Sequence, residues 1–147
     1  MDYEKALYEI LDKTTEIALA TSVNNMPSVR IVSICYDSNR SGVLYFQTNN
    51  IKSKKVSDIQ QNSNVSFTTS PIGKTIANVR SNNATVRRSV YTFDELKDLF
   101  IAKAPEYEAA YNKYGHTMTV FEIHIKEAII VVDYGIKPGI VKFNATD

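Results

Sequence analysis

The sequence predicts a mainly β fold with flanking helices, in which six or seven short strands close into a barrel. Three observations support this class: short β-branched and apolar runs recur along the chain, turn residues join them as hairpins, and few helical segments interrupt them. With 147 residues, 44% of them hydrophobic and 22% charged, we expect one domain over residues 1–147.

The first half of the chain is expected to supply one helix and three strands. Residues 2–13 place Ala6, Leu7, Ile10 and Leu11 on one stripe of an amphipathic helix that Asp2 caps. The strands are expected at 16–23, 28–36 and 43–48, with turns at 24–27 and 37–42. The strand at 28–36, SVRIVSICY, is apolar on both faces and should therefore be central.

The second half continues the β pattern around two helices. A strand is expected at 65–69 and a β-like stretch of ambiguous register at 75–90, where residues 81–83 indicate a bulge or tight bend. Thr92 and Glu95 form a capping box that begins a helix ending near Ala102, and a shorter helix follows at 105–111. Two closing strands are expected at 116–125 and 127–133.

The stretch TNNIKSKKVSDIQQ, residues 48–61, predicts a short helix after the strand at 43–48. Val56 and Ile59 supply its apolar face, which places Asp58 outward. Ser53 or Asn50 is expected to cap its start.

Three lysines crowd the first turn of this helix, although a helix N-terminus favours acidic residues. Lys52, Lys54 and Lys55 precede the first acid, and each is locally unfavourable by roughly a few tenths of a kcal/mol. Where a sequence breaks a local rule, a functional site is the first hypothesis. An anion such as phosphate, bound by the helix N-terminus, would explain the charges, and a solvated basic turn is the alternative.

Arg30 is a second anomaly, because it shares a strand face with Val32, Ile34 and Tyr36. A charged group among apolar neighbours needs a partner. A phosphate reached from the helix at 53–55 would suit its planar guanidinium, whereas an Arg30 near the strand end would reach water instead.

The order of several short motifs resembles the flavin-binding half of the pyridoxamine 5′-phosphate oxidase-like superfamily, the FMN-binding split barrels. The motifs lie within about residues 17–68 and are Ala20-Thr21, Pro27-x-x-Arg30, Phe46-x-Thr48, Ser53-Lys54-Lys55 and Asn62-x-x-Val65-Ser66. The resemblance implies a split β-barrel that binds FMN and forms a homodimer, with a flavin in each cleft at the subunit interface.

The resemblance also implies which residues bind the cofactor. Those expected around the FMN phosphate are Arg30, Ser53, Lys54 and Lys55. Those expected along the isoalloxazine or ribityl group are the backbone of Ile31, Val32 and Ser33, with Gln47 and Thr48. No side chain is assigned as a catalytic acid or base.

Two departures from the family pattern are visible. Asn82 or Asn83 stands where family members often carry glycine. The segment GIKPGIVKFNATD lacks the basic and aromatic motif with which the oxidase holds its substrate, and the chain has no tryptophan. The sequence is therefore expected to be closer to the small nitroimidazole-resistance-like members than to the oxidase itself.

Composition argues against several other classes. A net charge of +1 favours neither a nucleic acid nor a membrane partner, and no apolar run approaches the roughly 20 residues of a membrane span. The single Cys35 is expected in the core, and no metal-ligand pattern is visible. The charged first residues are unlike a signal peptide, so a cytoplasmic location is expected.

The remaining candidates are interpreted as mainly structural. His124 should be solvated, and His116 faces a flavin cleft or has no role. Arg87 and Arg88 should form a solvated strand end. The helical spacing of the tyrosines indicates packing; they are Tyr107, Tyr111 and Tyr114.

The leading functional hypothesis is an FMN-dependent oxidoreductase that passes electrons from a nicotinamide donor to a small-molecule substrate. The alternatives are a non-catalytic flavin- or haem-binding protein for storage or sensing, and a dimeric interaction domain that binds another phosphate. The sequence does not distinguish FMN from a deazaflavin.

Overall fold

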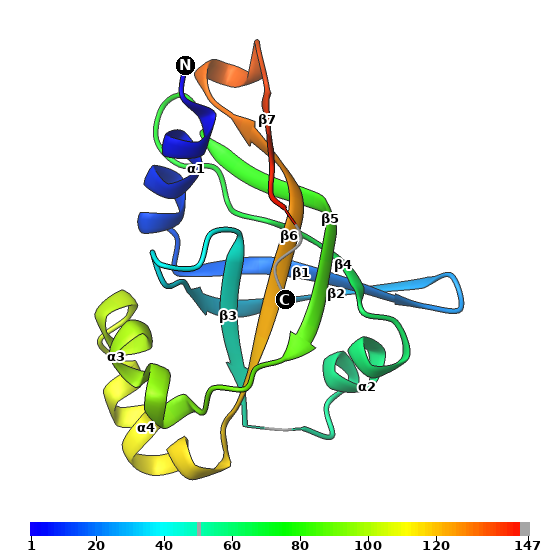
Figure 1. Cartoon of the computed structure of the whole chain (residues 1–147), viewed down its shortest axis with the longest axis vertical. Coiled ribbons are helices and arrows are strands. Elements are labelled where there is room, and N and C mark those ends of the chain that lie inside the picture. Colours follow the sequence, from blue (N-terminus) through cyan, green and yellow to red (C-terminus); the bar gives the residue numbers. More distant parts are fainter. Residues whose placement is uncertain (50, 145–147) are drawn as a thin grey trace.

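In the computed structural model, which describes residues 1–49 and 51–144, six antiparallel strands close into a barrel and a seventh extends the sheet (Figure 1). The strand order is β3-β2-β1-β4-β5-β6-β7, and pairing of β3 with β6 closes the barrel. The strands are β1 Glu16–Val23, β2 Met26–Cys35, β3 Val43–Thr48, β4 Asn64–Thr68, β5 Asn78–Arg88, β6 Thr119–Val131 and β7 Gly139–Lys142. The predicted split-barrel class is confirmed.

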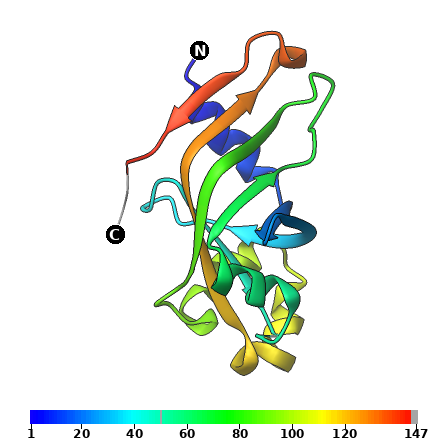
Figure 2. The same ribbon diagram turned by 90° about the vertical axis from the view of Figure 1, so that its right-hand side faces the viewer.

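Helices flank this barrel on several sides. They are α1 Tyr3–Asp12, α2 Lys54–Gln61, α3 Phe93–Lys103 and α4 Tyr107–Tyr114, with short 3-10 turns at Gly115–Thr117 and Asp133–Gly135. Helix α1 lies along β5, β6 and β7, whereas α2 contacts β1 at the opposite end of the molecule (Figures 1 and 2). Thr92 and Glu95 form the predicted capping box at the start of α3.

The β1–β2 hairpin follows directly from its turn residues. Asn24 and Asn25 have φ angles of 52° and 63°, and asparagine is one of the few residues that adopt this left-handed conformation readily. Strand β2 pairs with β1 from Met26 to Ser33, but with β3 only at Ile34 and Cys35. Most of β2 is therefore paired on one side only, where the barrel splits.

Strand β6 corrects the prediction of two closing strands. It continues without a break from Thr119 to Val131. Lys126, where the two predicted strands were separated, lies at the place where the neighbour of β6 changes from β3 to β7. The bulge expected near residues 81–83 is confirmed, because the β5–β6 register shifts between Arg80 and Ala84.

Strand β7 was not predicted. Its first residue, Gly139, lies against the ring of Tyr3, and a Cβ atom there would come within 2.1 Å of that ring. The contact joins the beginning of α1 to the last strand, which the periodicity of either segment alone cannot indicate.

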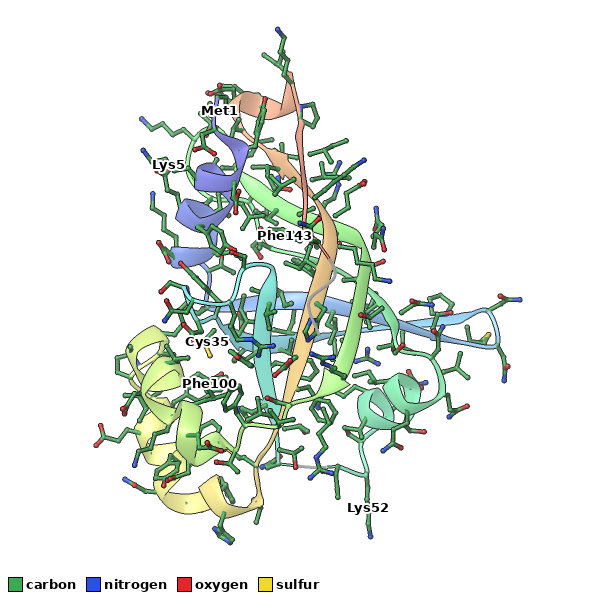
Figure 3. The ribbon with its side chains drawn as sticks, viewed as in Figure 1. Met1, Lys5, Cys35, Lys52, Phe100 and Phe143 are labelled. Atoms are coloured by element: carbon green, nitrogen blue, oxygen red, sulfur yellow. The ribbon has the colours of Figure 1, made fainter. Side chains whose placement is uncertain are left out.

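Two apolar cores stabilise the fold. One fills the barrel beneath α1 and includes Leu11, Phe46 and Ile123. The other lies between the outer face of β2 and β3 and helices α3 and α4, where Cys35 and Phe100 are both buried (Figure 3). Cys35 is a core residue as predicted, and burial raises the pKa of its thiol to about 12.

Candidate functional site

The residues predicted around a phosphate meet in one pocket. This open pocket of about 520 Å³ lies between β2 and the start of α2 and is lined by Ser28, Val29, Arg30, Ser53, Lys54 and Lys55. Strand β2 and helix α2 are far apart in the sequence, so the fold brings together two basic features that the sequence shows only separately.

The start of α2 has an unusual cap. Ser53 occupies the N-cap position, yet its side chain accepts no hydrogen bond from the helix. Its hydroxyl oxygen is buried and has no hydrogen-bond partner among the described residues. The first N–H groups of any helix lack partners within the helix, so this end offers donors to an anion. Asn50, the alternative cap, lies outside the described residues.

Asp58 faces inward, so the prediction that it faces outward was wrong. Its side chain is only 5% exposed, and it accepts hydrogen bonds from Thr21 Oγ1 at 2.8 Å and from Lys54 Nζ at 3.0 Å. Hydrogen bonds from Lys54 and then from Thr21 lower the pKa of the Asp58 carboxyl. The partner on β1 makes burial favourable, and the periodicity of α2 alone does not reveal that partner.

Arg30 has the partners that its position requires. One guanidinium nitrogen donates to Thr21 Oγ1 at 2.8 Å and to the Leu19 carbonyl at 3.3 Å. Another lies 3.5 Å from Asp58 Oδ2. The side chain is 21% exposed, so it reaches the pocket while these contacts hold it in place. Its first partners are thus protein groups rather than water.

Lys55 is a cation of this pocket for which the described residues provide no counter-charge. It is half-buried, and burial followed by the positive charge of Arg30 lowers the pKa of its ammonium. In the part of the chain that the structure describes, no carboxylate offsets this effect. Three cations, Arg30, Lys54 and Lys55, against the single carboxylate of Asp58 leave a surplus of two positive charges.

Of the residues predicted beside a flavin ring, three lie along β2 next to this pocket, and Gln47 and Thr48 lie at the end of β3. Ile31 is 60% exposed on the outer face of the sheet, as is Val29 at 69%. Ser33 and Gln47 are half-buried, whereas the side chains of Val32 and Thr48 are buried. The backbone of β2 before Ile34 has no pairing with β3, so the predicted ring contacts lie where this strand edge is open.

A second polar cluster surrounds Glu122 on the outer face of β6. Its carboxylate accepts bonds from Arg40 at 2.9 and 3.3 Å and from Ser89 at 2.7 Å, and it lies 2.8 Å from His124 and 3.6 Å from Arg87. The expectation of a solvated His124 was wrong, because its side chain is 13% exposed. The alternating pattern of β6 suggested a wet face, but Arg40 and Arg87 reach across from the β2–β3 loop and β5.

Other sequence candidates have plainer positions. His116 is exposed in a 3-10 turn, Arg88 is exposed at the end of β5, and Tyr107 is buried beneath α4. Among the described residues, no three His, Cys, Asp or Glu side chains lie close enough to hold a metal ion. The helices described here are all too short or too polar to cross a membrane.

Sequence reasoning did not assign Asp58 or Thr21 to the site. Asp58 follows Lys54 by four residues, which is the spacing of a helical ion pair and could have indicated their contact. Thr21 gave a weaker signal, since a threonine on a strand is ordinary until Arg30 and Asp58 are known to flank it.

The fold is a split barrel with a basic pocket at its open strand edge, and sequence comparison gives the family. Residues 10–137 match the family described as pyridoxamine 5′-phosphate oxidase-like, and the chain belongs to this family. None of the curated proteins matches the chain.

Solved structures show the same fold at low sequence identity. ChuZ of Campylobacter jejuni aligns with a TM-score of 0.74 and 14% identity over 95% of this chain and 58% of its own. A haem-binding protein of Mycobacterium smegmatis aligns with a TM-score of 0.73 and 15% identity over 97% of this chain and 58% of its own. This chain therefore spans little more than half the length of either protein.

A NimC/NimA family protein of Clostridium acetobutylicum is closer in length. It aligns with a TM-score of 0.66 and 19% identity, over 96% of this chain and 94% of its own. This agrees with the predicted likeness to the small nitroimidazole-resistance-like members of the family.

Proposed function

We propose that this chain is an FMN-binding flavoprotein whose pocket between β2 and α2 holds the FMN phosphate. The observation that carries the proposal is the pairing of an orphaned buried hydroxyl, Ser53, with an uncompensated half-buried cation, Lys55, in one pocket. A ligand that accepts hydrogen bonds and brings negative charge would satisfy both groups.

The charge of the pocket fits a phosphate monoester. Such a group carries about −1.5 to −2 at neutral pH, and the surplus of the pocket is two positive charges. Arg30 supplies a planar fork and Lys55 a point charge, while the N-terminus of α2 adds backbone donors. Asp58 is too well paired to repel the ligand as a free carboxylate would.

The sheet face beside the pocket fits the flavin ring. Val29 and Ile31 are exposed there, opposite the small residues Ala20 and Ala18 on β1. We propose that the ring lies along this face with Ser33, Gln47 and Thr48 nearby, and that a second copy of the chain covers it. Such a homodimer interface would bury roughly 2,000 Å² or more. Light scattering should give twice the mass of one chain with flavin bound, and a monomer mass would contradict the dimer.

We propose oxidoreductase activity as the use of this cofactor. When bound, FMN accepts two electrons with a hydride from a nicotinamide donor and passes two electrons to a small-molecule acceptor. The chain itself binds and orients the cofactor and limits solvent access, and we assign no side chain as acid or base. A bound flavin that no nicotinamide donor or dithionite reduces would favour storage or sensing instead.

The purified protein should show flavin absorption bands and quench the fluorescence of added FMN. A Soret band would indicate haem instead. Haem is the alternative because a solved structure with this fold is that of a haem-binding protein. Titrations with FMN and riboflavin test the phosphate site directly, because the two ligands differ only in the phosphate. We expect FMN to bind at least tenfold more tightly, and equal affinities would overturn the proposed site.

A further inference from the structure

Tyr107 is the first residue of α4 and packs against the outer face of the sheet. It is 8% exposed and belongs to the apolar core that includes Cys35, Val43 and Val120. Its ring meets Phe100 edge-on, with centroids 5.5 Å apart. The packing predicted for this tyrosine is therefore confirmed, but packing alone would be served equally well by phenylalanine.

The hydroxyl of Tyr107 is buried and finds no partner at hydrogen-bonding geometry among the described residues. The polar side chains of Ser33 and Gln47 lie beside it. Burial raises the pKa of the Tyr107 phenol, and these two side chains offset the rise only in part. A buried hydroxyl without a partner is unfavourable, and such groups are uncommon in folded proteins.

The position of this unsatisfied group is informative. In the part of the chain that the structure describes, only two buried side-chain nitrogen or oxygen atoms lack a partner, the hydroxyls of Ser53 and Tyr107. Ser53 lies in the proposed phosphate pocket. Tyr107 lies beside Gln47, which is expected at the ring, and beside Ser33, whose backbone is expected there. The unmet hydrogen bonds of this fold thus occur at both ends of the proposed flavin site.

We propose that Tyr107 is a positioning residue for the flavin ring. Once the ring is bound, its hydroxyl takes Gln47 and Ser33 as hydrogen-bond partners and so fixes these two side chains, whose polar groups then meet the polar edge of the isoalloxazine. This inference rests on the proposed function and extends the site from α2 at the phosphate to α4 at the ring. Because the hydroxyl is buried, it acts through these two residues and not by touching the reacting atoms.

The variant Tyr107→Phe tests the proposal, since it removes the hydroxyl and keeps the ring. In the flavin-free protein, Tm should stay the same or rise, because a buried unsatisfied group is lost. Kd should rise about three- to tenfold for FMN and by the same factor for riboflavin, because the effect concerns the ring and not the phosphate. The visible flavin spectrum and midpoint potential should shift as well.

Tyr111→Phe is the matched control. Tyr111 lies one turn further along α4, and its hydroxyl contacts Asp94, away from Gln47. This variant should leave flavin affinity and spectrum unchanged. In a Gln47→Ala background, the effect of Tyr107→Phe on FMN affinity should be smaller than in wild type, because part of that effect passes through Gln47.

Two results would overturn the inference while leaving the proposed function intact. One is a Tyr107→Phe protein with wild-type flavin affinity, spectrum and potential. The other is a large loss of flavin-free stability, which would mean that the hydroxyl already has a protein partner. Failure of the wild-type protein to bind any flavin would instead reject the proposed function and this inference together.

Discussion

Asp58 and Glu122 are both buried carboxylates surrounded by cations, but their surroundings differ in one respect. Glu122 accepts bonds from Arg40, Ser89 and His124, and Arg87 is also near. Burial would raise the pKa of Glu122, but the bonds from Arg40, Ser89 and His124 outweigh burial and lower it to about 2. Both oxygens of this carboxylate are used, and Arg40 additionally bonds the Tyr45 hydroxyl.

The Asp58 cluster is incomplete by comparison. Asp58 satisfies Thr21, Lys54 and Arg30. Among the residues that the structure describes, however, none gives Lys55 a counter-charge or the Ser53 hydroxyl a hydrogen bond. Whether all donors and charges are satisfied distinguishes the two kinds of polar cluster in this fold. We interpret the saturated cluster as one that holds elements together, and we propose that the cluster with unmet donors and surplus charge binds a ligand.

The largest effect is expected from breaking the saturated cluster. Glu122→Gln should lower the free energy of unfolding by roughly 3 kcal/mol at pH 7, because Arg40 and Arg87 lose their buried counter-charge. Urea denaturation measures the loss. Glu127→Gln on the same strand is the control, and a loss below about 1 kcal/mol for Glu122→Gln would show that the cluster is not structural.

The difference in stability between wild type and Glu122→Gln should depend on pH. The folded pKa of Glu122, about 2, lies below its ordinary 4.5, so its contribution is complete above pH 4.5 and is lost as pH falls towards 2. The stability gap between wild type and Glu122→Gln should therefore be constant near neutral pH and close in that acidic window. Denaturation curves at a series of pH values measure the gap, and a gap that stays open at pH 2 would contradict the assigned cause.

Removing a cation from the Asp58 cluster should weaken flavin binding and should not lower the stability of the fold. Lys55→Ala should raise Kd for FMN about 10- to 150-fold, the effect of losing one charge-assisted hydrogen bond. Flavin-free stability should hold or rise, because Lys55 lies beside Arg30 without compensation. Riboflavin binding should not change.

Lys52→Ala is the matched control for this variant, since Lys52 lies just before the same helix but does not line the pocket (Figure 3). If both lysine variants weakened FMN equally, general attraction and not a defined site would explain binding. Loss of stability on removing Lys55 would place it with the structural residues.

The comparison also shows what the sequence could predict. A closed barrel and the meeting of Arg30 with Lys54 and Lys55 followed from local rules: short strands, turn residues and charges at the wrong end of a helix. The split-barrel class followed from the resemblance of the ordered motifs to a known family. The environments of Asp58, Glu122 and His124 did not, because their partners come from other elements. A period on one helix or strand places a side chain on a face, but it does not say what lies opposite.

The smallest and most diagnostic effect concerns two N-cap residues. Thr92 accepts a hydrogen bond from the Glu95 N–H at the start of α3, whereas Ser53 accepts none at the start of α2. Thr92→Ala should therefore lower the free energy of unfolding by about 1 kcal/mol, the usual effect of losing an N-cap. Ser53→Ala should leave flavin-free stability unchanged or slightly higher, because its hydroxyl caps nothing. It should instead raise Kd for FMN about 2- to 12-fold, the range for one hydrogen bond, with no change for riboflavin.

Thermal denaturation and flavin titration of the two variants measure both quantities. If Ser53→Ala destabilised the flavin-free protein as Thr92→Ala does, Ser53 would be an ordinary cap, and the incomplete cluster would lose one of the two features that mark it as a ligand site.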